Sequence, residues 1–284
     1  MLKKLLKYDL IAVWRFWWIL ATCVLGLSTV GAFVLRFVIS YIDNPNFSFF
    51  TTIGILFLAL CGFVIVSSIA ATYIFVYLRF YKNFFTDEGY LTFTLPVSRR
   101  KLFLSKTLNA LIWEVAHILL LALAAVIFML FAPPAERGGF INPIAFQELG
   151  EALSVFWSTF GGWTILYAIE LVVLALLCGL FSISMIHFCI TIGAIIAKKA
   201  KLLAAIGIYY AINMAFSLIT QVLGTISLMV LIEGYIARAT YWSPNEGMLS
   251  FALILLTLCG MMGVLATLFY NLTLDRIERR LNLA

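Results

Sequence analysis

Charged side chains are scarce in this sequence. Asp, Glu, Lys and Arg make up 11% of its 284 residues, and 64% of the residues are hydrophobic. Soluble domains are about a quarter charged. A chain this apolar cannot cover its own surface for water, so its solvent must be the lipid bilayer. Its net charge of +6 is therefore information about membrane topology and does not predict nucleic acid as a partner.

The residues and motifs of the common active sites are also missing. There is no GxxxxGK[ST] phosphate loop, no HExxH pair and no GxSxG elbow. The two histidines, His117 and His187, are too few for most metal sites, and no Cys/His spacing suits zinc. Glu114 and His117 form one Glu-x-x-His, but a di-iron bundle needs two copies. We expect no catalytic residue, metal or cofactor in this chain.

Cysteine and proline are few, and their positions in the sequence predict which segments are buried and which helices are continuous. Cys23, Cys61, Cys178, Cys189 and Cys259 all fall in apolar runs, where we expect small buried hydrophobes. The prolines all fall in predicted loops or at predicted helix starts, so the spans should be continuous helices. That disfavours a secondary transporter, because many of these build their sites from broken helices. The prolines are residues 45, 96, 133, 134, 143 and 244.

Long apolar runs are what the sequence has in abundance. Each is long enough for the ~20 residues that a bilayer requires. They predict an all-α membrane protein of six spans, with residues 1–284 as a single transmembrane domain. The predicted spans are 17–40, 51–78, 104–131, 161–197, 202–232 and 247–272.

The distribution of Lys and Arg predicts the orientation. If both termini are cytoplasmic, only Arg36, Arg137 and Arg238 of the 19 basic residues lie outside. Cytoplasmic loops carry an excess of Lys and Arg, so this bias favours cytoplasmic N and C termini. The sequence thus predicts a multi-pass protein whose longest basic crossing lies between spans two and three.

Two further segments are predicted to be amphipathic. Residues 1–16 combine lysines with leucines at helical spacing, which is typical of a helix in the membrane interface. The run that follows is long enough to span, so we expect it to be retained and not cleaved as a signal peptide. Asp9 interrupts the apolar face, and we expect it to pair with a nearby Lys or Arg. Residues 132–160 have the same helical spacing and predict an outer amphipathic helix.

Two glutamates and two histidines inside the spans need an explanation, because such groups are costly in a bilayer. At about 1.5 Å per residue, Glu114 and His117 lie at a depth similar to that of His187, while Glu170 lies nearer the outer leaflet. They either line a substrate path or form structural hydrogen bonds. In the fifth span, Gly207, Ala211 and Ala215 form a stripe of small residues that is typical of close helix packing, either within the chain or between subunits.

The cytoplasmic segment 79–103 is too apolar for a free loop. Its acidic pair would be unfavourable against an anionic inner leaflet, which favours a protein partner over lipid. We expect the partner to contact these residues: Phe84, Phe85, Asp87, Glu88, Gly89, Tyr90, Leu91 and Leu95.

The string DEGYLTFTLPVSRRKLFLSK in this crossing, together with the six-span architecture, resembles the type-2 ABC (ATP-binding-cassette) permeases of bacteria. The resemblance implies a permease subunit of an exporter in the bacterial cell membrane, acting as a homodimer or heterodimer. ATP and Mg²⁺ would bind to separate ABC ATPase subunits, and about Phe84–Leu95 would be the coupling helix.

Two other functions stay open: an ion-coupled secondary transporter with a proton relay through Glu114, His117 and His187, and a non-transporting immunity or scaffold protein.

Overall fold

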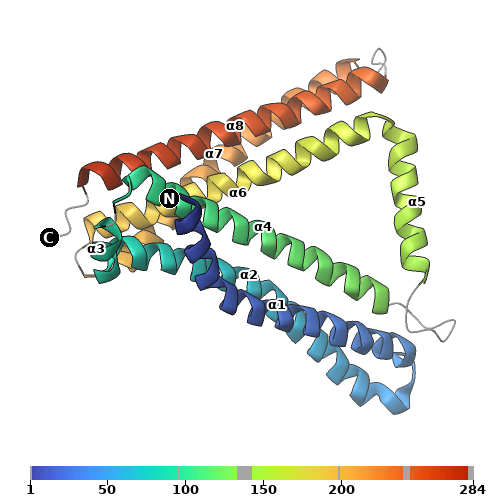
Figure 1. Ribbon diagram of the computed structural model, residues 1–284. Helices are drawn as coiled ribbons and strands as arrows, with labels where there is room; N and C mark the ends of the chain where they lie inside the picture. The colour runs from blue at the N-terminus through green and yellow to red at the C-terminus, as the bar shows by residue number, and fades with distance from the viewer. Residues whose placement is uncertain (1, 95, 133–142, 198, 239–243, 281–284) are drawn as a thin grey trace. The chain divides into compact units, whose positions relative to one another are not determined.

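The computed structural model describes residues 2–94, 96–132, 143–197, 199–238 and 244–280, and over these residues the chain forms helices and no strand (Figure 1). Six of the helices are long and apolar enough to cross a membrane. The predicted all-α class and the six spans are thereby confirmed by length and composition. The orientation of the termini stays a prediction.

The spanning helices extend beyond the predicted spans at most of their ends. The helix of the second span continues to Phe85, and the helix of the third span begins at Arg99. Long Lys and Arg side chains let a helix continue past the hydrocarbon region, because their charged ends reach water. A short 3-10 turn, Pro45–Phe47, is capped by Asn44, whose Oδ1 accepts a hydrogen bond from the Asn46 amide at 3.1 Å. The helices are α1 (Leu2–Tyr41), α2 (Ser48–Phe85), α3 (Asp87–Phe93), α4 (Arg99–Phe131), α5 (Pro143–Phe160), α6 (Trp163–Ile196), α7 (Lys201–Arg238) and α8 (Pro244–Arg280).

Residues 1–16 do not form a separate helix. From Leu2 onward they are the first turns of α1, which continues without a break to Tyr41. Part of the face that we assigned to lipid packs against the protein, since Val13 and Asp9 are buried and Leu5 and Leu6 are half-buried, whereas Trp14 is 51% exposed. A place for these turns in the membrane interface stays a prediction.

By internal contacts, the chain that we predicted as a single domain divides into two compact units. The first consists of residues 1–79 and 104–159, and the second of residues 80–103 and 160–284. The chain passes from one unit to the other within α2 and returns within α4.

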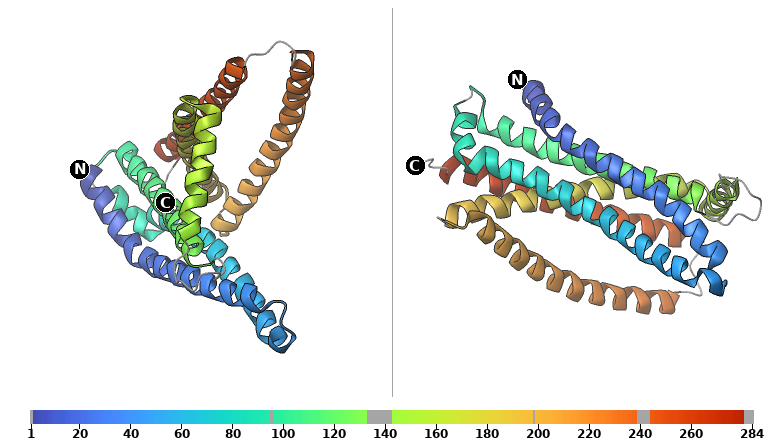
Figure 2. Two further views of the ribbon diagram at one scale, coloured as in Figure 1. Left: turned by 90° about the vertical axis from the view of Figure 1, so that its right-hand side faces the viewer. Right: turned by 90° about the horizontal axis from the view of Figure 1, so that it is seen from below.

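In the first unit, α1 packs along α4 and forms a hairpin with α2 (Figure 2). Ala21 and Val24 of α1 cluster with Leu120 and Ala124 of α4. The Ser28 hydroxyl donates a hydrogen bond to the Ala124 carbonyl at 2.6 Å. Small side chains at these positions let the helix backbones approach closely, which is how helices associate in lipid.

In the second unit, α6 packs against both α7 and α8. Met185 and Cys189 of α6 cluster with Phe269 of α8. Gly193 allows the closest approach, because a Cβ there would lie 2.6 Å from the Ala205 amide nitrogen of α7. Near the other end of α6, the Tyr167 hydroxyl donates to the Met248 carbonyl at 2.8 Å.

The cysteine prediction is partly wrong. Cys61, Cys189 and Cys259 are buried, but Cys178 is half-buried and Cys23 is exposed, and all five are free thiols. An apolar helix in a bilayer carries no signal that separates its lipid face from its packed face, so the sequence could not distinguish these positions.

Candidate functional site

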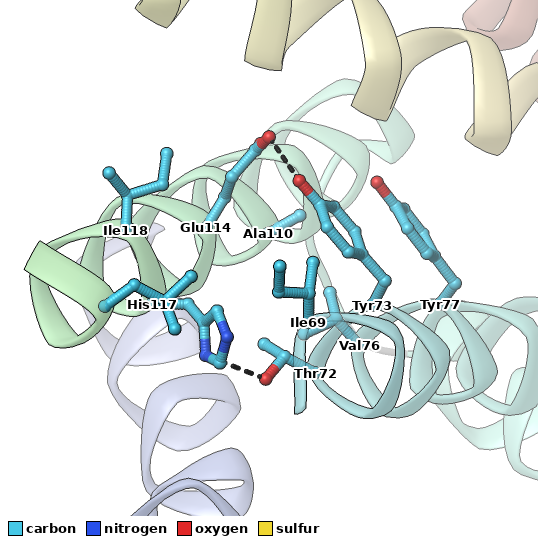
Figure 3. A pocket seen from close by; sticks show the side chains of 10 residues that line it. Ile69, Thr72, Tyr73, Val76, Tyr77, Ala110, Glu114, His117 and Ile118 are labelled. Atoms are coloured by element: carbon cyan, nitrogen blue, oxygen red, sulfur yellow. Dashed lines mark hydrogen bonds between the residues drawn. The ribbon is translucent and has the colours of Figure 1, made fainter. Parts of the chain in front are cut away.

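A small cavity lies between α2 and α4 in the first unit (Figure 3). Its volume is about 90 Å³, roughly that of three water molecules in the liquid. Drug-sized ligands occupy pockets of about 300–1,000 Å³, so this cavity accepts only a small group. It is lined by Ile69, Thr72, Tyr73, Val76, Tyr77, Ala110, Glu114, His117, Ile118 and Leu121.

Glu114 is the acidic residue of this cavity. The Tyr73 hydroxyl donates a hydrogen bond to Glu114 Oε1 at 2.6 Å. The second carboxylate oxygen, Oε2, is buried and accepts no hydrogen bond from any residue that the structure describes. A carboxylate in a membrane span is costly unless it is fully paired, so half of this group still requires a partner or a proton.

His117 lies one turn further along α4, with both ring nitrogens in contact with hydroxyl groups of α2. Its Nε2 is 3.3 Å from the Ser68 hydroxyl and its Nδ1 is 3.1 Å from the Thr72 hydroxyl. A neutral imidazole donates from one nitrogen and accepts at the other. The ring is therefore held in place as a polar bridge between the two helices, and Glu114 is left as the acidic group of the cavity.

Two aromatic faces complete the site. Tyr73 and Tyr77 project from successive turns of α2 with ring centroids 5.9 Å apart and planes 10° from parallel. Figure 3 shows them side by side next to the Glu114 carboxylate. Sequence reasoning did not select these tyrosines, although their spacing of four residues, which puts them on one helix face, was the signal available.

The other two predicted path residues lie in the second unit. His187 is fully buried on α6 among aromatic rings, with the Phe80 centroid at 4.0 Å and the Phe103 centroid at 5.6 Å. Glu170 is half-buried on α6, and its Oε2 accepts no hydrogen bond from a described residue. His187 thus belongs to an aromatic core. The structure groups Glu114 with His117 only.

The segment between α2 and α4, which we predicted to be cytoplasmic, contains the helix α3. Phe84 and Phe85 end α2 and are buried, with the Phe84 ring tilted by 33° against Phe80 and edge-on to Phe93. We predicted that these two phenylalanines needed a partner to cover them. That premise is wrong, because the chain covers them itself.

Three observations explain how α3 is held. Gly89 is buried so close to α2 that an added Cβ would lie 2.8 Å from the Phe84 carbonyl oxygen. Phe93 packs on Phe84, and the Arg99 guanidinium lies 5.5 Å from the centre of the Phe93 ring, within the range of a cation–π contact. The helix is therefore fixed by its inner face.

The outward face of α3 stays exposed. Asp87 and Glu88 are exposed in its first turn, and Leu91 has 69% of its surface exposed. Acidic residues favour the first turn of a helix, which accounts for their place there. The Tyr90 side chain and all of Leu95, both predicted contacts, lie outside the described part of the chain.

Arg99 also ties the start of α4 to the end of α8, which sequence reasoning did not anticipate. Its Nη1 donates to the carbonyls of Ile277 and Glu278, both at 2.9 Å. These belong to the last four carbonyls of α8, which have no partner within the helix. Arg100 adds an exposed ion pair with Glu278 at 3.0 Å.

The predicted packing stripe Gly207, Ala211 and Ala215 lies exposed on α7. A Cβ added at Gly207 would meet no atom within 4 Å. Of the two roles left open, packing within the chain is therefore not seen among the described residues, and an interface between subunits stays a prediction. No family model, no curated protein and no solved structure matches this chain.

Proposed function

We propose that this chain is the membrane-spanning permease subunit of an ATP-driven exporter of the ABC type, whose ATPase is a separate chain that binds ATP and Mg²⁺. One observation carries the proposal: α3 is fixed from within and presents Asp87, Glu88 and Leu91 to the exterior. A firmly held helix with an acidic and apolar outward face is suited to receive force from a partner. The sequence also has no nucleotide-binding motif of its own.

In this proposal, Phe84 and Phe85 are the base of the coupling helix and not its contact surface. The partner would touch Asp87, Glu88 and Leu91, and its movement would pass through the Phe84–Phe93 contact to α2 and through Arg99 to α8. Two copies of the permease, identical or different, would pair with two ATPase subunits in the bacterial cell membrane.

The experiment is co-purification with a co-expressed candidate ABC ATPase, followed by measurement of the ATPase rate in bilayer nanodiscs. Asp87→Arg and Leu91→Asp should each abolish co-purification, since they invert the charge and polarity of the exposed face. Asp43→Arg, at an exposed aspartate in the loop between α1 and α2, is the matched control and should co-purify normally. Normal binding and stimulation in both α3 variants would refute the docking role.

A second candidate, an ion-coupled secondary transporter, is favoured by the half-paired Glu114 carboxylate in its cavity. It predicts proton uptake by proteoliposomes without ATP, measured with a pH-sensitive dye, and loss of that uptake in Glu114→Gln. Uptake that persists in Glu114→Gln would exclude this candidate.

A further inference from the structure

We infer that the cavity between α2 and α4 binds a primary ammonium group, with the Glu114 carboxylate as its counter-ion and the rings of Tyr73 and Tyr77 as its walls. The binding site follows from the residues of the cavity alone. The view that the amine is cargo rests on the proposed transport function.

The charge of the ligand follows from the Glu114 carboxylate. Tyr73 satisfies Oε1, while the buried Oε2 has no donor among the described residues. The Thr72 hydroxyl donates to the Ser68 carbonyl at 3.0 Å and also contacts His117. Glu114 Oε2 is therefore an unfilled acceptor among the described residues at the cavity, and a group with N–H donors and one positive charge complements it when the carboxyl group is ionised.

The walls of the cavity favour the same ligand. The rings of Tyr73 and Tyr77, nearly parallel with centroids 5.9 Å apart, line the cavity, and aromatic rings attract a cation that is removed from water. The remaining walls include the apolar side chains of Ile69, Val76 and Leu121. Such walls suit the first carbons of an alkyl substituent next to the ammonium group.

Size and ligand count exclude the main alternatives. The volume of about 90 Å³ is too small for a drug-sized cation. A divalent metal ion needs several ligands, and the described residues contain no group of three or more His, Cys, Asp or Glu side chains that could hold one. A small ammonium group needs only the carboxylate and the ring faces.

The experiment measures protection of Glu114 from dicyclohexylcarbodiimide, an apolar reagent that modifies carboxyl groups within membranes. The full chain, without an ATPase, is labelled in phosphatidylcholine nanodiscs and the modified peptides are quantified by mass spectrometry. Butylammonium at about ten times its dissociation constant should lower labelling of Glu114 about tenfold, because mass action leaves about a tenth of the sites free. Glu170, also half-buried in a span, is the internal control and should be labelled equally with and without amine.

Two further labelling experiments identify the ligand. Butanol has the same carbon chain and no charge, so it should not protect Glu114. Nanodiscs that contain phosphatidylethanolamine test whether a lipid headgroup supplies the ammonium. Protection by this lipid assigns the site to a headgroup, and protection by butylammonium alone assigns it to a free amine. Equal protection by butanol, or no protection by either amine, overturns the inference.

A second measurement does not depend on labelling. Butylammonium should raise the melting temperature of the wild-type protein relative to equimolar butanol, because a ligand that binds only the folded state stabilises it. The gain should be lost in Glu114→Gln and kept in Glu151→Gln, at an exposed glutamate of α5. An equal gain in Glu114→Gln overturns the inference. Amine binding without ATPase binding would refute the proposed function and leave the site intact, and the converse result would do the opposite.

Discussion

The Lys106 ammonium donates a hydrogen bond to Asp9 Oδ1, and the two form an ion pair in which each side chain is only 10% exposed. The neighbouring Ser105 hydroxyl donates to Asp9 Oδ2 at 3.2 Å. The pair ties the first turns of α1 to the first turns of α4. It confirms that Asp9 pairs with a basic residue, and it explains why these turns pack against the protein.

Removal of one member of this pair should destabilise the protein strongly. Asp9→Asn and Lys106→Met each leave an uncompensated buried charge, which costs about 3–5 kcal/mol. The measurement is thermal unfolding in detergent. The double variant Asp9→Asn/Lys106→Met should recover most of the loss, because no charge is then left unpaired. Asp43→Asn, at an exposed aspartate, serves as control, and additive losses in the double variant would argue against the pairing.

The pair also marks the limit of what the sequence could predict. The six spans were predictable because about twenty consecutive apolar residues have few alternatives to crossing a bilayer. The amphipathic face of residues 1–16 was predictable as a pattern, but not its partner, since apolar side chains suit lipid and protein equally. In this chain hydropathy identified the helices and did not identify their contacts.

The candidate site was predictable to a similar degree. Glu114 and His117 stood out because ionisable residues are rare in spans, but their partners Tyr73 and Thr72 lie on another helix whose rotation the sequence does not specify. Phe84 and Phe85 were assigned to a partner because the sequence does not show that they end α2, where α3 covers them. A buried glycine at position 89 allows the chain to fold back and cover them.

Arg99 should stabilise the end of α8. Each charge-assisted hydrogen bond to a carbonyl contributes about 1.5 kcal/mol. Arg99→Met removes two of them, so amide exchange over residues 274–280 should be about a hundredfold faster. Hydrogen–deuterium exchange with mass spectrometry measures this. Arg100→Gln is the matched control, because the Arg100–Glu278 pair is 72% and 36% exposed and such pairs contribute about 0–1 kcal/mol. Equal effects of the two variants would contradict the capping role of Arg99.

Gly193 and Gly207 should differ sharply in their tolerance of a methyl group. In Gly193→Ala the new Cβ would lie 2.6 Å from the Ala205 nitrogen, so α6 and α7 must move apart, and overpacking of this kind costs about 1–3 kcal/mol. In Gly207→Ala the Cβ meets nothing within 4 Å, and the change should stay below about 1 kcal/mol. Melting temperatures in detergent compare the two. A loss in Gly207→Ala that grows with protein concentration would instead support the predicted subunit interface.

Gly89→Ala should weaken the packing of α3 against the end of α2 without altering the amine site. The added Cβ would lie 2.8 Å from the Phe84 carbonyl oxygen, a backbone atom that cannot give way without moving α3. We therefore expect the Phe84–Phe93 contact to loosen and co-purification with the ATPase to fall several-fold. Protection of Glu114 by butylammonium should stay unchanged, because Gly89 and the cavity belong to different units.

Gly62→Ala, on α2 with open space around its Cβ, is the control for helix content. If Gly89→Ala bound the ATPase as well as Gly62→Ala does, a precisely seated α3 would not be what the partner recognises, and the coupling role would have to move elsewhere in residues 80–103.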